Sequence, residues 1–162
     1  MNYYTKELWI KINSESEEER IAAEKLWSAN DKAYCKYYQK IKKYLPEEFR
    51  NVLENGELHD CLIERITIDF SKKGQPCVFM RLLNGNKEYQ LVFEDVSAFE
   101  GQICDLSYAI QNRLSWSYAE IEILSIENDV MIKLSVLCDV MNEISFQFGK
   151  IAIETIDRDF MK

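Results

Sequence analysis

Apolar and polar side chains alternate from Leu62 onward, and this alternation constrains the fold more than any other feature of the chain. The apolar positions of the first alternating stretch are Leu62, Ile66, Ile68 and Phe70. Such a pattern is typical of a half-buried β-strand, whereas the residues before it have helical spacing. We therefore predict an α+β fold in which residues 1–56 are helical and residues 57–162 form a sheet. A length of 162 residues fits a single domain.

A long helix is expected to begin near Ser14 or Ser16. Ser16 and Glu19 have the spacing of a capping box, and lysines gather at the far end, where the helix dipole favours positive charge. Pro46 suits the first turn of a second, short helix, which Asn55-Gly56 would end. The long helix carries one predicted apolar stripe, made of Leu26, Ala29, Ala33, Tyr37, Ile41 and Tyr44.

Asn84-Gly85 is a favoured two-residue turn pair and predicts a hairpin between residues 76 and 96. The register counted back from this turn places Arg81 opposite Glu88, as a cross-strand ion pair. On the same register six side chains face the core: Val78, Met80, Leu82, Tyr89, Leu91 and Phe93.

Three further strands are expected after the hairpin, at residues 116–126, 130–136 and 144–156. The last of them changes its apolar parity at Gly149, which predicts a bulge or a sharp bend there. A helix is expected at residues 105–114. The predicted sheet therefore has about six strands, mostly antiparallel and meander-like, with the long and the short helix packed on it.

The net charge of −8 is unevenly distributed along the chain. Residues 1–50 carry ten Lys or Arg against nine Asp or Glu, whereas residues 51–162 carry ten against nineteen. An acidic sheet repels phosphate backbones, which argues against nucleic-acid binding and favours a basic or cationic partner, for which we expect a protein. No apolar run is long enough to span a bilayer, and residues 1–6 lack a signal-peptide core. We therefore expect a cytoplasmic protein without membrane contact.

The five cysteines are odd in number, widely spaced and without a Cys-x-x-Cys pair, and the chain has a single histidine. These residues do not supply the ligand set of a structural zinc site, so we expect reduced thiols and no bound metal. The five glycines are isolated, which excludes a glycine-rich phosphate loop. We expect no cofactor.

His59 and Asp60 lie where the helical part meets the first strand, and they allow two interpretations. In the first they form a junction clamp, with the Asp60 carboxylate bonded to backbone N–H groups and His59 partly buried against the helix. In the second His59 opens into a cleft with another titratable side chain within hydrogen-bond reach, as in an active site. We expect the clamp, because the sequence has no glycine-flanked serine for the histidine to activate.

Glu120 and Glu122 would share one face of the strand at 116–126, close to Trp116 and Tyr118. Paired carboxylates beside aromatic side chains can bind sugars or perform acid–base catalysis. The same row is also typical of the solvent face of an ordinary strand, and we expect no catalytic role for it.

Three short stretches resemble an uncharacterised family of small proteins from Gram-positive bacteria. They are Met1-Asn2-Tyr3-Tyr4-Thr5-Lys6-Glu7 with Trp9, Leu45-Pro46 ahead of Leu58-His59-Asp60-Cys61, and Trp116-Ser117-Tyr118-Ala119-Glu120-Ile121-Glu122. The chain is more compact than members of that family, which often have a longer helical region before the His-Asp motif. The resemblance implies the helices-then-sheet layout and a bacterial cytoplasmic origin, and it implies no activity, cofactor or catalytic residue.

Three classes of function fit these features. A non-enzymatic binding protein would use its acidic surface to bind a protein partner, and an immunity-type protein that neutralises a toxin is one version. A homo-oligomeric structural protein would use the aromatic stripe of the long helix as its interface. A small hydrolase-like enzyme would be centred on His59 with Glu120 and Glu122. We predict the binding protein; a deep pocket containing His59 would favour the enzyme, and a flat acidic surface the binding protein.

Overall fold

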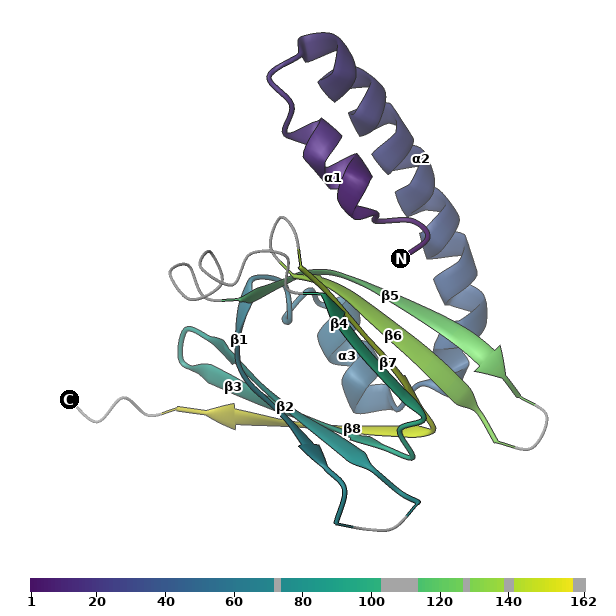
Figure 1. Cartoon of the computed structure of the whole chain (residues 1–162), viewed down its shortest axis with the longest axis vertical. Coiled ribbons are helices and arrows are strands. Elements are labelled where there is room, and N and C mark those ends of the chain that lie inside the picture. The colour runs from purple at the N-terminus through teal and green to yellow at the C-terminus, as the bar shows by residue number, and fades with distance from the viewer. Residues whose placement is uncertain (72–73, 103–113, 127–128, 139–141, 159–162) are drawn as a thin grey trace.

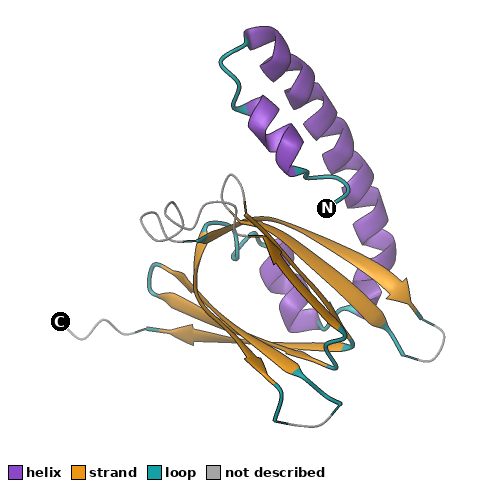
Figure 2. Ribbon diagram, in the orientation of Figure 1, coloured by secondary structure: helices purple, strands orange, loops and turns teal. Residues whose placement is uncertain are grey.

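The computed structural model describes residues 1–71, 74–102, 114–126, 129–138 and 142–158. Within them the helices come first and the strands follow, so the α+β class is confirmed (Figures 1 and 2). The sheet has eight strands instead of the predicted six or so. The helix expected at 105–114 lies, apart from its last residue, outside the described residues.

The helices are α1 (Lys6–Ile12), α2 (Glu17–Ile41), the 3₁₀ turn η1 (Lys42–Tyr44) and α3 (Glu47–Glu54). Ser16 caps α2 as predicted, because its hydroxyl oxygen accepts the Glu19 N–H at 3.4 Å. After α3 the chain turns at Gly56, where φ is 68°. α1 lies beside the N-terminal half of α2, which extends away from the sheet, whereas the C-terminal half of α2 lies beside β5 (Figure 1). None of the described helices is long and apolar enough to cross a membrane.

The sheet is antiparallel, in the order β4-β7-β6-β5-β1-β2-β3-β8. It bends over on itself, so that β4, β7, β6 and β5 face β1, β2, β3 and β8 across the core (Figure 1). The strands are β1 (Cys61–Asp69), β2 (Cys77–Asn84), β3 (Lys87–Glu94), β4 (Ala98–Gln102), β5 (Ser115–Ser125), β6 (Met131–Cys138), β7 (Asn142–Phe148) and β8 (Lys150–Asp157).

Two differences explain the larger number of strands. The first is β4, which pairs with β7. It was not predicted, because its five residues are too short a stretch to show alternation. The strand predicted at 144–156 is divided at Gly149, since β7 pairs with β6 whereas β8 pairs with β3 in the opposite half of the sheet. The predicted bend at Gly149 is therefore confirmed, and it passes the chain from one half of the sheet to the other.

The β2–β3 hairpin has the predicted faces but a different register. All six side chains predicted to face the core are at most 1% exposed. The register is wrong by two residues, since Leu83 rather than Arg81 lies opposite Glu88, and Arg81 reaches Glu88 diagonally at 2.6 Å. The loop is Gly85-Asn86 instead of Asn84-Gly85, with φ of 59° at Gly85. The faces are unchanged because strand side chains alternate with a period of two.

β1 contains a bulge after Ile63, which changes the face that its alternate residues present. Cys61 and Ile63 are buried before the bulge, and Ile66 packs against the core after it. The single parity predicted for this strand is therefore wrong, and Phe70 at its end is 73% exposed.

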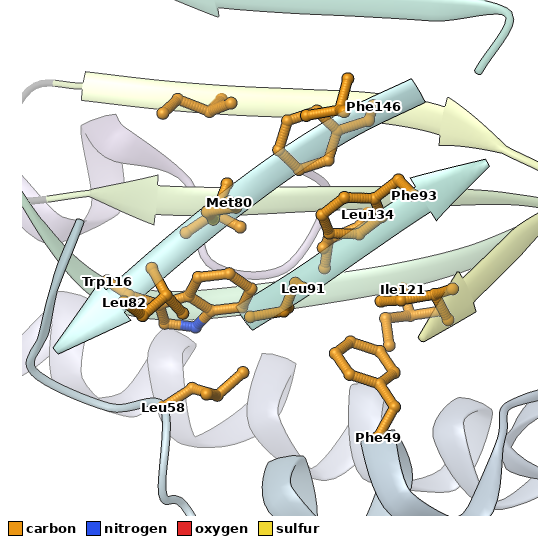
Figure 3. Close-up of a cluster of buried hydrophobic side chains, with 14 of the residues drawn as sticks. Phe49, Leu58, Met80, Leu82, Leu91, Phe93, Trp116, Ile121, Leu134 and Phe146 are labelled. Atoms are coloured by element: carbon orange, nitrogen blue, oxygen red, sulfur yellow. The ribbon is translucent and has the colours of Figure 1, made fainter. Parts of the chain in front are cut away.

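Both halves of the sheet and α3 contribute to one hydrophobic core (Figure 3). Phe93 of β3 packs on Phe146 of β7 with ring centroids 4.8 Å apart, and Phe49 of α3 is fully buried in the same core. Trp116 also points into the core and is 2% exposed (Figure 3). A register shift between Trp116 and Tyr118 explains this, because it places the two rings on opposite faces of β5.

Candidate functional site

β5 is paired with β1 over only two residues, and helix α2 covers the edge that is left open. The hydroxyl oxygens of Tyr34 and Tyr37 on α2 accept hydrogen bonds from the N–H groups of Ile121 and Ile123. Because side chains rather than a strand close this edge, a pocket remains between α2, α3 and the first half of β5.

The pocket has a volume of about 530 Å³, which is in the range of small-molecule sites. Apolar and aromatic side chains form much of its wall. Its polar side chains come from the N-terminal segment, α2, α3, the loop before β1 and β5; they are Tyr4, Asp31, Tyr34, Cys35, Tyr38, Gln39, Glu54, His59, Ser117 and Tyr118.

Tyr118 is the centre of an aromatic cluster on the outer face of β5. Its ring centroid lies 5.4 Å from that of Tyr4, 5.6 Å from Trp9, 4.8 Å from Trp27 and 5.5 Å from His59. The cluster joins the N-terminal segment and α2 to the sheet. Tyr4, Tyr118 and His59 also line the pocket, so the cluster provides one of its walls.

Asp31 faces the same wall from α2. Its Oδ1 atom accepts a hydrogen bond of 2.6 Å from the Tyr4 hydroxyl. Burial and this hydrogen bond to a carboxylate raise the pKa of Tyr4. Burial, followed by the negative charges of Asp60 and Asp31, raises the pKa of Tyr118. Both phenols therefore remain neutral, and the carboxylates give this wall a negative potential.

Tyr38 has a buried hydroxyl oxygen that makes no hydrogen bond within the described residues. Burial raises the pKa of Tyr38 to about 12, and the nearby Glu54 carboxylate adds to the rise against the opposing charge of Arg50. Glu54 itself contacts Lys42 Nζ at 3.2 Å. The Tyr38 hydroxyl and the Glu54 carboxylate therefore bring two polar groups to this end of the pocket.

The junction clamp predicted for His59 and Asp60 is wrong in its side-chain contacts. The Asp60 side chain is 77% exposed, and its carboxylate lies 3.1 Å from His59 Nδ1. The His59 side chain is partly buried, as predicted, at 49% exposed, and it packs edge-on against Tyr118 of β5. The backbone holds the junction instead, because the Asp60 N–H donates to the Trp116 carbonyl at 2.8 Å with Asp60 at φ 61°. His59 lies in the pocket wall, as the active-site alternative requires.

Glu120 and Glu122 hold the N-terminal segment and do not line the pocket. Glu120 is 1% exposed, and its carboxylate accepts the N–H groups of Asn2, Tyr3 and Tyr4, each at 2.6 Å. Glu122 accepts a hydrogen bond from the Asn2 side-chain amide. The expected solvent face is therefore wrong for Glu120, and both carboxylates of the alternative acid–base pair bond to the N-terminal segment, Glu120 to its backbone and Glu122 to the Asn2 side chain. Neither carboxylate is brought together with His59.

The apolar stripe predicted on the long helix is wrong along its first half. Leu26 is 53% exposed, and Ala29 and Ala33 are also exposed. Besides Gln39, four residues of α2 line the pocket with the spacing i, i+3, i+4 and i+7, and they are Asp31, Tyr34, Cys35 and Tyr38. The sequence analysis missed these four residues because it assigned the buried face of the helix to the stripe that contains Ala29 and Ala33. The common spacing of the four residues is the signal that could have identified them.

The described thiols differ in environment. Cys61 and Cys138 are buried, whereas Cys35 is exposed in the pocket wall. Burial raises the pKa of the Cys61 thiol to about 11. Across the described ranges no group of three or more His, Cys, Asp or Glu side chains could hold a metal ion. Cys104 lies outside those ranges, and reduced, metal-free cysteines stay a prediction.

Comparison with protein-family models and with curated proteins finds no match for this chain. The resemblance to a family of small Gram-positive proteins therefore stays a prediction.

Proposed function

We propose that this protein is a non-enzymatic binding protein that takes up a small organic ligand in the pocket between α2, α3 and β5. The observation that carries the proposal is a pocket of about 530 Å³ on which polar groups from separate elements converge. Ligand sites typically combine apolar and aromatic walls with a few placed polar groups. Here Asp31, Tyr38 and His59 are those polar groups.

Hydrogen bonds within the chain fix two side chains of the pocket wall. Tyr34 is fixed by the 2.8 Å hydrogen bond that it accepts from the Ile121 N–H, and Tyr4 is fixed through its own N–H, bonded to Glu120. Because these hydrogen bonds already order the two side chains, ligand binding costs little additional side-chain entropy. This preorganisation supports a binding role for the pocket.

A variant that fills the pocket tests the proposal. Cys35→Trp places a large side chain at an exposed position of α2 in the pocket wall. Ala33→Trp is the matched control, because Ala33 is exposed on the same helix and does not line the pocket. Each protein is screened with a small-molecule fragment library by ¹H–¹⁵N correlation spectroscopy, after its unfolding temperature has been checked.

We expect fragments to shift the amide signals of His59 and Tyr118 in the wild type and in Ala33→Trp, and not in Cys35→Trp. A library that shifts neither signal in the wild type would refute the proposed function. Equal binding of the same fragments to Cys35→Trp would refute the pocket as the site.

A hydrolase-like enzyme is the second candidate, and the contact between His59 and Asp60 favours it. The Asp60 carboxylate, 3.1 Å from Nδ1, orients the imidazole so that Nε2 could act as a general base. We rank this function second, because Asp60 is largely exposed and because none of the described hydrogen bonds joins His59 to Cys35 or Ser117, the cysteine and serine that line the same pocket. Hydrolysis of p-nitrophenyl esters that His59→Gln abolishes would reverse this ranking.

The other predicted roles remain proposals. The tyrosines of α2 that would form a homo-oligomer interface are partly engaged within the chain, since Tyr34 and Tyr37 bond to β5. An acidic surface that binds a protein partner, an immunity-type role and a cytoplasmic location rest on charge and composition alone. Size-exclusion chromatography with light scattering tests the oligomer.

A further inference from the structure

We propose that the ligand of this pocket is a small organic cation, such as a quaternary ammonium or guanidinium compound, held by Asp31 and the aromatic rings around it. This inference rests on the proposed binding function and adds the chemical class of the ligand.

The charged side chains that line the pocket are acidic. Asp31 and Glu54 are part of the wall, and no Lys or Arg is among the described residues that line it. Two basic side chains lie at the other end of the pocket, where Lys42 contacts Glu54 and Arg50 lies near Tyr38. Tyr38 is seven residues from Asp31 on α2, which is about 10 Å along the helix. Neither of these two basic side chains is therefore placed to pair with Asp31.

Asp31 has a neutral partner instead of a counterion. Its described hydrogen bond comes from the Tyr4 hydroxyl, and no Lys, Arg or His of the described residues forms an ion pair with it. A half-buried carboxylate in this state gains more from a cation than a fully hydrated carboxylate does, because the surrounding protein screens the charge less than water. The same carboxylate would repel an anionic ligand.

The rings beside Asp31 add a second attraction for a cation. Tyr4 lies 5.6 Å from Tyr34 and 5.4 Å from Tyr118 between ring centroids, and all three line the pocket. The negative face of an aromatic ring attracts ammonium and guanidinium groups, and this attraction grows when water is excluded. Burial raises the pKa of each of these phenols, so the rings stay neutral at physiological pH. A carboxylate and neutral aromatic rings in the wall of one pocket together favour an organic cation.

The test compares cations with neutral molecules of the same shape. Choline is paired with 3,3-dimethylbutan-1-ol, and butylguanidinium with butylurea, and binding to the full chain is measured by the same amide shifts. Asp31→Asn removes the charge but keeps an oxygen that can accept the Tyr4 hydrogen bond. Glu24→Gln is the matched control, because Glu24 is an exposed carboxylate on α2 that does not line the pocket.

We expect each cation to bind about tenfold more tightly than its neutral partner. One carboxylate and a set of aromatic rings supply a difference in affinity of this size. Asp31→Asn should remove that preference, whereas Glu24→Gln should keep it. Equal affinity for the cation and its neutral partner, or a preference that survives Asp31→Asn, overturns the inference. If neither cation binds while fragments from the library still occupy the pocket, the cation inference fails and the proposed function stands. If nothing occupies the pocket, both fail.

Discussion

The backbone N–H of Ile121 donates a hydrogen bond of 2.8 Å to the hydroxyl oxygen of Tyr34. Ile121 lies on β5 beyond the two residues that pair with β1, so this N–H has no neighbouring strand to bond. The next N–H on the same edge, that of Ile123, donates to the Tyr37 hydroxyl at 3.1 Å. Two phenols on α2 therefore take the place of a neighbouring strand along this part of β5. The pocket begins where the pairing between β1 and β5 ends.

Removing one of these hydroxyls should destabilise the protein. Tyr34→Phe leaves the Ile121 N–H without an acceptor beside the helix, which should lower the free energy of unfolding by about 1–3 kcal/mol. Urea denaturation measures this change. Tyr3→Phe is the control, because the Tyr3 hydroxyl makes none of the described hydrogen bonds, and we expect a change within about 0.5 kcal/mol. Equal effects of the two variants would contradict an edge-closing role for Tyr34.

The Glu120 carboxylate should be essential for the N-terminal segment. Glu120→Gln replaces one acceptor oxygen by an amide donor that faces backbone N–H groups, which should cost about 1–3 kcal/mol of unfolding free energy. Hydrogen exchange of the Tyr3 and Tyr4 amides should also become faster. Glu122→Gln serves as the control, because the bond from Asn2 to Glu122 is exposed and its loss should have little effect. Unchanged exchange in Glu120→Gln would refute the anchor.

The sequence predicted the faces of the hairpin because side-chain parity depends only on the alternation of residues along each strand. It did not predict the register, because Asn84-Gly85 and Gly85-Asn86 are both acceptable turn pairs that differ in which residue takes a positive φ. The bend at Gly149 was also predicted, since the apolar parity changes at that position. The bulge after Ile63 left no such signal and changed the face of Leu62.

The candidate site was harder to predict than the fold. His59, Trp116 and Tyr118 were identified as candidate residues, and all three line the pocket. Asp31 and Tyr38 were missed, because nothing in the sequence indicates that β1 leaves β5 after two residue pairs. Glu120 was noted for its charge, but its three backbone partners at residues 2–4 are a long-range contact that spacing along one strand does not reveal.

Asp60 should matter for its backbone conformation more than for its carboxylate. Its φ is 61°, in the left-handed region, and its side chain is 77% exposed. Asp60→Ala should lower the free energy of unfolding by about 1 kcal/mol, because alanine tolerates this conformation less well than aspartate. Asp60→Gly should be neutral or slightly stabilising, since glycine adopts positive φ freely. Thermal or urea denaturation of both variants separates a backbone effect from an effect of the carboxylate. An equal decrease of the free energy of unfolding in the two variants would show that the carboxylate has a structural role.

Glu88 should contribute to the decrease of stability in acid. Its carboxylate accepts hydrogen bonds from Arg81 Nη2 at 2.6 Å and from Gln90 Nε2 at 2.7 Å, and these bonds lower the pKa of Glu88 from 4.5 to about 2. As the pH falls, the unfolded chain binds this proton near pH 4.5, whereas the folded chain binds it only near pH 2. The stabilising effect is therefore complete above pH 4.5 and is lost progressively as the pH falls to about 2.

Glu88→Gln should accordingly be less stable than the wild type at pH 7, and its unfolding free energy should fall less steeply between pH 4.5 and pH 2. Urea denaturation at a series of pH values measures both effects. Glu94→Gln is the control, because Glu94 is an exposed carboxylate on the same strand and makes none of the described hydrogen bonds with its side chain. The two variants should therefore differ in the slope of stability against pH. Identical slopes would show that the contact between Arg81 and Glu88 contributes nothing in solution.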